Sequence, residues 1–216
     1  MFSGGLKFLT ENSKRSKKPK METSDLEYTG TEDQHIPIDL FGSKKHAGVP
    51  RGILAFTDAS GNIVFKVHRQ PPDPNSSSSL KDTKLLLDSN DNPLFSIHRH
   101  HNGIWKCYKG SGDENKELVL QVKRTVKTIT KVELEVFFAG ERLKDNDTCD
   151  LKVIGSPFKR SCSVYKDGDL VAQSSLMYKL NQIYVSRGKF RLTIFPGIID
   201  RGLIVALFVI FLNGRK

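Results

Sequence analysis

The distribution of apolar residues predicts β-strands along most of the chain. Between Leu118 and Phe138 the even positions are largely apolar, whereas the odd positions include Lys123, Glu133 and Glu135. A period of two places alternate side chains on opposite faces of a strand, so that one face packs in a core and the other meets solvent. The segment is therefore predicted to form half-buried antiparallel strands.

Three further segments have the pattern of β-hairpins, in which two β-rich runs flank a polar turn that contains aspartate. They are GILAFTDASGNIVFKV (Gly52 to Val67), LLLDSNDNPLFSI (Leu85 to Ile97) and CSVYKDGDLVAQSS (Cys162 to Ser175). Polar turns of this kind, rich in Asp, Asn and Gly, typically join antiparallel neighbours. Many such strands with one solvent-exposed face predict a sandwich or a barrel.

The apolar run from Leu203 to Leu212 is predicted to be a helix inside the protein. It has ten residues, whereas a helix that crosses a bilayer needs about 20. Asp200 suits the N-cap position and Gly214 suits the end, which favours a helix over Arg201 to Asn213. A helix that is apolar on all sides must be enclosed on all sides. The fold class expected is therefore mainly β, a closed antiparallel β-barrel around a hydrophobic C-terminal helix.

Length and composition predict one globular domain. The chain has 216 residues, of which 38% are hydrophobic and 27% charged, enough for a sizeable core. Its three cysteines, Cys107, Cys149 and Cys162, show no CxxC spacing, and the first residues do not resemble a signal peptide. We expect a cytoplasmic protein in which Cys149 and Cys162 are packing thiols rather than a redox pair.

The net charge of +10 belongs to the predicted domain. Residues 1–35 hold six Lys or Arg and six Asp or Glu, so residues 36–216 carry the whole excess of positive charge. Residues 1–35 are also poor in aromatic and β-branched residues, a composition typical of a flexible tail. We predict a charged tail over 1–35 and a barrel domain over 36–216.

Five segments, in order along the chain, carry a resemblance to a known family. They are LFGSKKHAGVPRGILAFTDASGNIVFKV, LLLDSNDNPLFSIHR, WKCYKG, CDLKVIGSPFKRSCSVYKDGDLVAQ and FRLTIFPGIIDRGLIVAL. With them the chain resembles the plant LURP-one-related proteins over most of Asp39 to Leu212. The resemblance implies the tubby C-terminal-like fold, a β-barrel threaded by a hydrophobic helix. It also implies distant kinship with phospholipid scramblases and with tubby proteins, which bind phosphoinositides, and a link to plant defence.

Basic residues cluster in the last third of the chain. Residues 151–191 contain eight Lys or Arg against Asp167 and Asp169, and phosphorylated head groups need several converging cations. The alternative is a solvated basic face with no dedicated ligand. The candidate anion-binding residues are Lys152, Lys159, Arg160, Lys179, Arg187, Lys189 and Arg191.

The tail contains a second basic cluster, the segment KRSKKPK. This composition is typical of a nuclear import signal or of a tether to a membrane surface, and equally of solvated charge. The candidate residues of this signal are Lys14, Arg15, Lys17, Lys18 and Lys20.

Enzyme and metal signatures are not found in the sequence. It has no GxxxxGK[ST], GxSxG or HExxH motif, so we predict no enzymatic activity and no cofactor. His98 and His100 would share one strand face and need a third ligand to hold a metal. We interpret HRHH as an exposed basic strand end and predict no metal site.

The sequence thus predicts a non-enzymatic binding or regulatory protein. The expected partner is anionic phospholipid, a phosphoinositide in particular, or another protein, and no transmembrane span is expected. The alternative is a nuclear, membrane-tethered type of transcription regulator. Nucleic acid is the weaker candidate as partner, because the sequence has no recognition helix or zinc finger and Trp105 fits a core position. The corresponding locations are the cytoplasm, the periphery of a membrane and the nucleus.

Overall fold

The computed structural model describes Met1 and most of the chain from Ile36 onward. The described ranges are 36–70, 83–100, 103–111, 117–128, 130–140, 148–177, 188–197 and 199–213. The predicted tail, with its five-cation segment, lies outside them, so the division at residue 35 stays a prediction.

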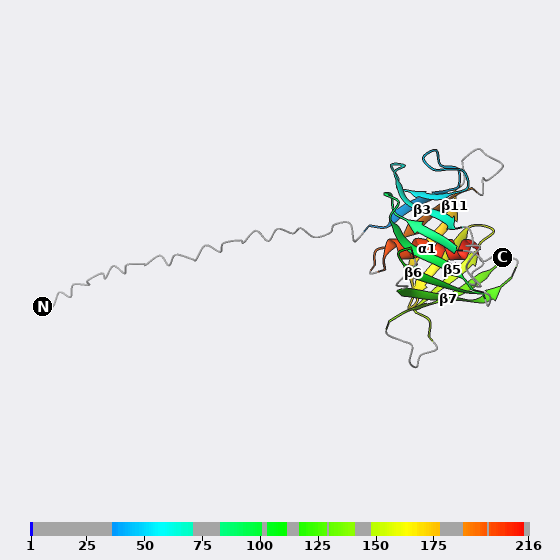
Figure 1. Ribbon diagram of the computed structural model, residues 1–216. Coiled ribbons are helices and arrows are strands. Elements are labelled where there is room, and N and C mark those ends of the chain that lie inside the picture. The colour runs from blue at the N-terminus through cyan, green and yellow to red at the C-terminus, as the bar shows by residue number, and fades with distance from the viewer. Residues whose placement is uncertain are drawn as a thin grey trace. The chain divides into compact units, whose positions relative to one another are not determined.

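Twelve antiparallel strands form a closed barrel in which each strand pairs with its neighbours in sequence and β1 pairs with β12 (Figure 1). The first six strands are β1 (Ile38–Ser43), β2 (Leu54–Thr57), β3 (Ile63–Gln70), β4 (Thr83–Leu87), β5 (Pro93–Arg99) and β6 (Ile104–Lys109). The other six are β7 (Leu118–Lys127), β8 (Val132–Phe138), β9 (Leu151–Ser156), β10 (Ser161–Lys166), β11 (Asp169–Leu176) and β12 (Lys189–Ile194). The three predicted hairpins correspond to β2–β3, β4–β5 and β10–β11.

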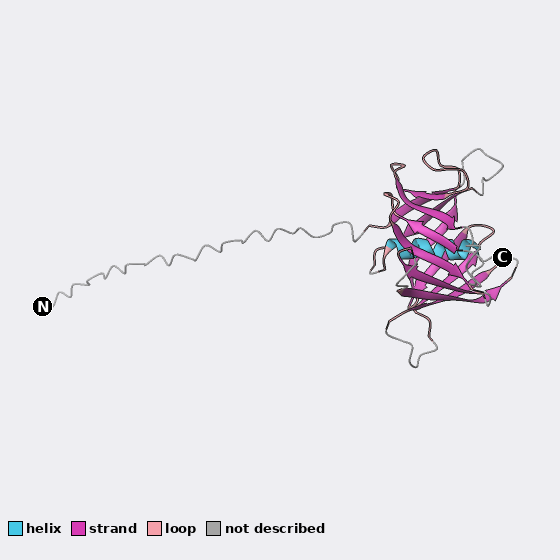
Figure 2. Ribbon diagram, viewed as in Figure 1, coloured by secondary structure: helices cyan, strands magenta, loops and turns pink. Residues whose placement is uncertain are grey.

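The helix α1 (Arg201–Asn213) lies inside this barrel, as Figure 2 shows. Its residues from Gly202 to Phe211 are all buried. The backbone N–H of Leu203 donates to Asp200 Oδ1 over 2.9 Å, so Asp200 caps the helix as its sequence position predicts. The predicted fold class and the predicted bounds of the helix are both confirmed. In the described part of the chain, no helix has the length and hydropathy that a membrane crossing requires.

The strands bury the alternate positions that the sequence pattern indicated. Along β7 and β8 the inward residues Leu120, Val122, Leu134 and Val136 are at most 2% exposed. They surround the helix, whose own apolar side chains fill the interior. Because strand parity decides which side chains face the helix, it also decides which polar residues reach the interior at the two ends of the barrel.

Aromatic side chains join the wall to the helix. The ring of Phe190 on β12 lies 4.9 Å from that of Phe208 on α1 and 5.8 Å from that of Phe56 on β2, measured between centroids. Gly42 on β1 leaves room for this ring, because a Cβ at position 42 would lie only 2.0 Å from Phe190. This close approach requires glycine.

Candidate functional site: a cation-lined cavity at one end of the barrel

The two ends of the barrel differ in charge. At the end where α1 finishes, here named the basic end, the strand termini and turns carry many cations: Lys44, Lys45, Arg51, Arg69, Lys84, Arg99, Lys159, Arg160 and Lys189. At the opposite end, the acidic end, they carry most of the described carboxylates: Asp39, Asp58, Asp88, Asp91, Glu117, Asp150, Asp167, Asp169 and Asp200. An anionic partner is therefore attracted to one end of the barrel.

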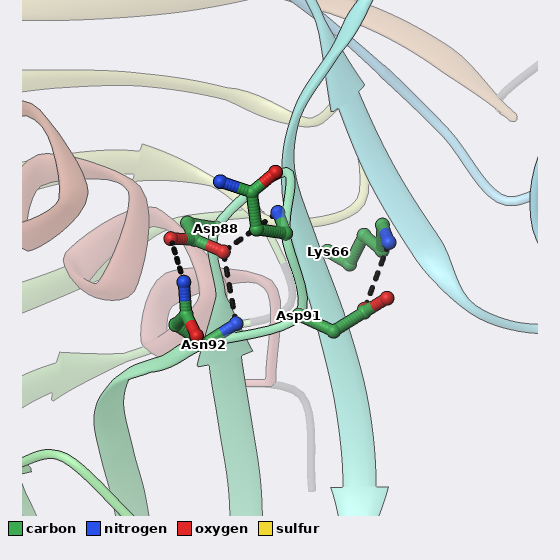
Figure 3. A network of polar contacts seen from close by, with 5 residues as sticks. Lys66, Asp88, Asp91 and Asn92 are labelled. Carbon is green, nitrogen blue, oxygen red and sulfur yellow. Dashed lines mark hydrogen bonds and ion pairs between the residues drawn. The ribbon is translucent and has the colours of Figure 1, made fainter.

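The carboxylates of the acidic end hold turns together. Figure 3 shows Asp88, which accepts hydrogen bonds from the backbone N–H and the side-chain amide of Asn92, both at 2.9 Å. In the same turn Asp91 pairs with Lys66 of β3 over 2.8 Å. Asp58 and Asn62 repeat the first arrangement in the β2–β3 turn. The hydrogen bonds from Asn92 lower the pKa of Asp88, and those from Asn62 lower the pKa of Asp58. These aspartates therefore stabilise the two turns.

The basic end contains a cavity of about 540 Å³. Its lining comes from the β1–β2 connection, the ends of β2, β3 and β4, the β9–β10 turn and the C-terminal end of α1. The lining residues are Lys44, Gly52, Ile53, Leu54, Val67, His68, Arg69, Lys84, Pro157, Arg160, Val209, Leu212 and Asn213. Four of these carry a positive charge, and among the described residues no carboxylate lines the cavity.

Strand parity explains why Arg69 and Lys84 reach the cavity. Arg69 lies two residues after Val67, and Lys84 lies two residues before Leu86; both apolar residues are buried and face the interior. Residues two apart on a strand share a face, so each cation occupies an inward position at the mouth. Arg69 and Lys84 are also direct partners in the β3–β4 register. Like charges directly opposite each other in a sheet are unfavourable unless groups of opposite charge offset them.

Arg160 is held in place by the tight turn between β9 and β10. Its N–H donates to the carbonyl of Pro157 over 3.3 Å, and its own carbonyl accepts from Ser174 Oγ over 3.0 Å. Its φ of 50° is uncommon for a residue with a side chain. The guanidinium carbon lies 5.5 Å from the centroid of the Phe190 ring, a cation–π contact. The turn and the aromatic core together fix a cation at the cavity.

The floor of the cavity is apolar. It is lined by Val209 and Leu212 of α1, Leu54 of β2 and Val67 of β3. A cavity with cations at its mouth and apolar side chains below suits a ligand that joins an anionic group to an apolar part.

The structure brings one of the seven predicted anion-binding residues, Arg160, into this cavity. Lys152 lies on the outer wall, where its Nζ is 3.7 Å from Glu133 Oε2. Arg191 also lies on the outer wall, where its Nη1 is 3.6 Å from Asp39 Oδ2. Lys159 and Lys189 are exposed at the basic end but do not line the cavity. Lys179 and Arg187 lie outside the described residues.

Sequence reasoning did not select Lys44, Arg69 and Lys84. Strand parity marks them as inward residues. Arg69 and Lys84 each lie two residues from a buried position of their own strand, and Lys44 lies two residues after the buried Gly42, just beyond the end of β1. Counting charge over residues 151–191 ignored this parity. It therefore combined inward and outward cations of the last four strands and left out the first four strands.

His98, Cys107 and Cys162 are buried in the fold. His98 is 6% exposed; its Nδ1 lies 3.3 Å from Thr83 Oγ1 and its ring packs edge-on against Tyr108. The described residues include no group of three or more His, Cys, Asp or Glu side chains placed to hold a metal ion. Cys107 and Cys162 are buried free thiols, and burial raises the pKa of each to about 12. The expectation of an exposed strand end is wrong at His98, because its side chain is buried, with Thr83 of β4 and Tyr108 of β6 beside it.

Comparison with known proteins places the chain among plant relatives. The sequence model of the family described as LURP-one-related matches residues 38–212. Protein LURP-one-related 7 of Arabidopsis thaliana is 52% identical over 181 residues, which cover 84% of this chain and 92% of the relative. Protein LURP-one-related 10 of the same plant is 32% identical over 81% of this chain and 88% of its own length. An X-ray structure of an Arabidopsis thaliana protein superposes with a TM-score of 0.58 and 29% identity, and the match covers 83% of this chain and 91% of that one.

Proposed function

The chain belongs to the LURP-one-related family, and we propose that it is a non-enzymatic binding protein whose basic end takes up an anionic phospholipid head group. The observation that carries the proposal is the cavity at the basic end, which four cations line and which no carboxylate of the described chain enters. The names of the relatives state no enzymatic activity.

The physical chemistry of phosphate fits this cavity. A phosphorylated head group carries more than one negative charge, and each Lys or Arg near an anionic surface contributes about 1 kcal/mol. Arg69 and Arg160 add paired N–H donors, which match phosphate oxygens better than an ammonium group does. The cavity volume of about 540 Å³ lies within the range of roughly 300–1,000 Å³ that small-molecule sites occupy.

A purely structural role for the same cations is the main alternative. The carbonyl end of α1 carries a partial negative charge, which nearby cations stabilise. In that case the cations support the helix and bind no ligand. Nucleic acid has less support than lipid, because the helix of the described chain is buried in the barrel and has no access to a groove. The biological setting we propose is regulation at the cytoplasmic surface of a membrane, with plant defence as the process that the family resemblance implies.

Vesicle sedimentation tests the proposal. Phosphatidylcholine vesicles with a phosphoinositide are compared with vesicles that carry equal charge as phosphatidylserine. The cavity variant K44Q/R69Q/K84Q removes three cations at the mouth, and we expect binding to phosphoinositide vesicles to fall by about one hundredfold. The matched variant K109Q/K166Q/R201Q removes three cations from the acidic end and should bind as the wild type does.

The outcomes separate the alternatives. Equal losses in the two variants would mean that diffuse charge attracts the protein and that the cavity has no special part. A lower melting temperature of K44Q/R69Q/K84Q with unchanged binding would assign the cations to support of the helix. Either result would overturn the proposed function.

A further inference from the structure

The β9–β10 turn divides its four residues between the cavity and the surface. Pro157 is buried and Arg160 half-buried, and both line the cavity. Phe158 and Lys159, at the tip between them, are exposed, with 45% of the Phe158 surface accessible to solvent. The same turn thus supplies part of the site and places an aromatic ring directly outside it.

The backbone of this turn is held firmly. The hydrogen bond from Arg160 N–H to the Pro157 carbonyl closes it, and Ser174 on β11 anchors the Arg160 carbonyl. The fixed φ of Pro157 and the cation–π contact of Arg160 with Phe190 restrict it further. A tip on a rigid base loses little conformational freedom when it contacts a partner.

An exposed apolar side chain by itself requires no explanation, since many protein surfaces have one. The surroundings of Phe158 are what distinguish it. Its neighbours in sequence are Lys159 and Arg160, and Met177, which is 39% exposed, follows β11 at the same end of the barrel. Aromatic rings beside cations are typical of segments that lie at the boundary between lipid head groups and acyl chains.

We propose that the β9–β10 turn is a membrane-insertion element, in which Phe158 enters the interfacial layer of an anionic bilayer beside the cavity. Lys159 and Lys189 then face the phosphates of neighbouring lipids, while the cavity lined by Pro157 and Arg160 receives one head group. The inference rests on the proposed function for the identity of the surface and adds how the barrel is oriented on it: the basic end faces the membrane and the acidic end faces away. Charge complementarity favours an anionic bilayer over an apolar protein partner.

The test compares two exposed apolar residues at opposite ends of the barrel. Leu170 on β11 is 37% exposed and lies next to Asp169 at the acidic end, so L170A is the matched control for F158A. Insertion would remove the exposed part of the Phe158 side chain from water, which favours binding to the bilayer. We therefore expect F158A to bind anionic vesicles about tenfold more weakly, and L170A to bind them as the wild type does. A soluble inositol phosphate should bind F158A and the wild type equally, because Phe158 does not line the cavity.

Fluorescence quenching adds a direct measure of insertion. The chain has one tryptophan, Trp105, which is 3% exposed. F158W therefore adds a reporter at the tip, and lipid brominated in its acyl chains should quench its emission. The wild type and L170W, mixed with the same vesicles, should show little quenching.

The outcomes also separate this inference from the proposed function. If the wild type binds the soluble inositol phosphate and F158A binds vesicles as tightly as the wild type does, the head-group site is supported and the proposed insertion of Phe158 is wrong. If F158W is quenched but soluble inositol phosphate fails to bind the wild type, insertion stands and the head-group site is wrong. Absence of quenching of F158W on vesicles that bind the protein would overturn the inference and direct attention to a protein partner at this tip.

Discussion

Arg69 and Lys84 stand directly opposite each other on the β3–β4 ladder, so two positive side chains meet at the mouth of the cavity. A cross-strand pair of like charges costs free energy, whereas a pair of opposite charges stabilises by roughly 0.2–1 kcal/mol. A substitution in this pair can therefore distinguish an effect on stability from an effect on ligand binding.

Lys84→Glu should have opposite effects on the two properties. The substitution gives Arg69 a carboxylate as its cross-strand partner, so we expect the free energy of unfolding in urea to stay equal or rise slightly. Head-group affinity should fall at least tenfold, because the cavity loses a cation worth about 1 kcal/mol and gains an anion. Lys109→Glu at the acidic end supplies the control for the change in net charge. Loss of stability together with binding would show that Lys84 supports the fold.

Gly42→Ala should destabilise the barrel through Phe190. The added Cβ would lie 2.0 Å from the Phe190 ring, which packs against Phe56 and Phe208 and lies under Arg160. Overpacking of this kind costs about 1–3 kcal/mol, measured as a shift of the urea midpoint. Displacement of the ring also moves the Arg160 guanidinium, so head-group affinity should fall with stability.

Gly197→Ala provides the comparison for Gly42, because a Cβ at position 197 would meet no atom within 4 Å. Gly197→Ala should leave the urea midpoint and the head-group affinity close to those of the wild type. A Gly42→Ala protein as stable as Gly197→Ala would contradict the packing described for Phe190.

The sequence predicted the barrel and its helix because their signals are local and strong. Alternation at Leu120, Val122, Leu134 and Val136 requires a buried strand face, and an apolar run capped at Asp200 requires enclosure. The cavity depends instead on which strand ends meet at one end of a closed barrel. Arg69, Lys84 and Arg160 are up to 91 residues apart in sequence, and no local pattern brings them together.

The acidic end should make stability depend on pH in the acid range. Hydrogen bonds from Asn62 and Asn92 hold the pKa of Asp58 and Asp88 below its usual value. A carboxyl group with a lowered pKa in the folded state stabilises the fold above its unfolded pKa of about 3.9. That stabilisation is lost as the pH falls through the pKa that the carboxyl group has in the folded state. Thermal melting of the wild type should therefore move to lower temperature below about pH 4.

The double variant D58N/D88N tests the origin of this pH effect. It lacks both carboxylates, so it should melt below the wild type at pH 7, and the difference should shrink as the pH approaches 3. A difference that stays constant from pH 7 to pH 3 would mean that these carboxylates are not its source. Lys66→Met removes the neighbouring ion pair with Asp91 and the smallest of the contributions that lower the pKa of Asp88, so it should narrow this convergence only slightly.

Removal of residues 1–35 tests whether the tail or the barrel holds the protein on an anionic surface. The deletion leaves the net charge at +10, because the tail has as many acidic as basic residues. If the basic end supplies the affinity, the truncated protein should bind phosphoinositide vesicles within about twofold of the wild type, and binding should still weaken with salt. The charge-reversal variant K159E/R160E/K189E/R191E should lose most of its binding in both the full-length and the truncated protein, since three of its four positions lie at the basic end. Binding that disappears with the tail and survives these four substitutions would assign the attachment to Lys14, Arg15, Lys17, Lys18 and Lys20, and the barrel would then serve only as their support.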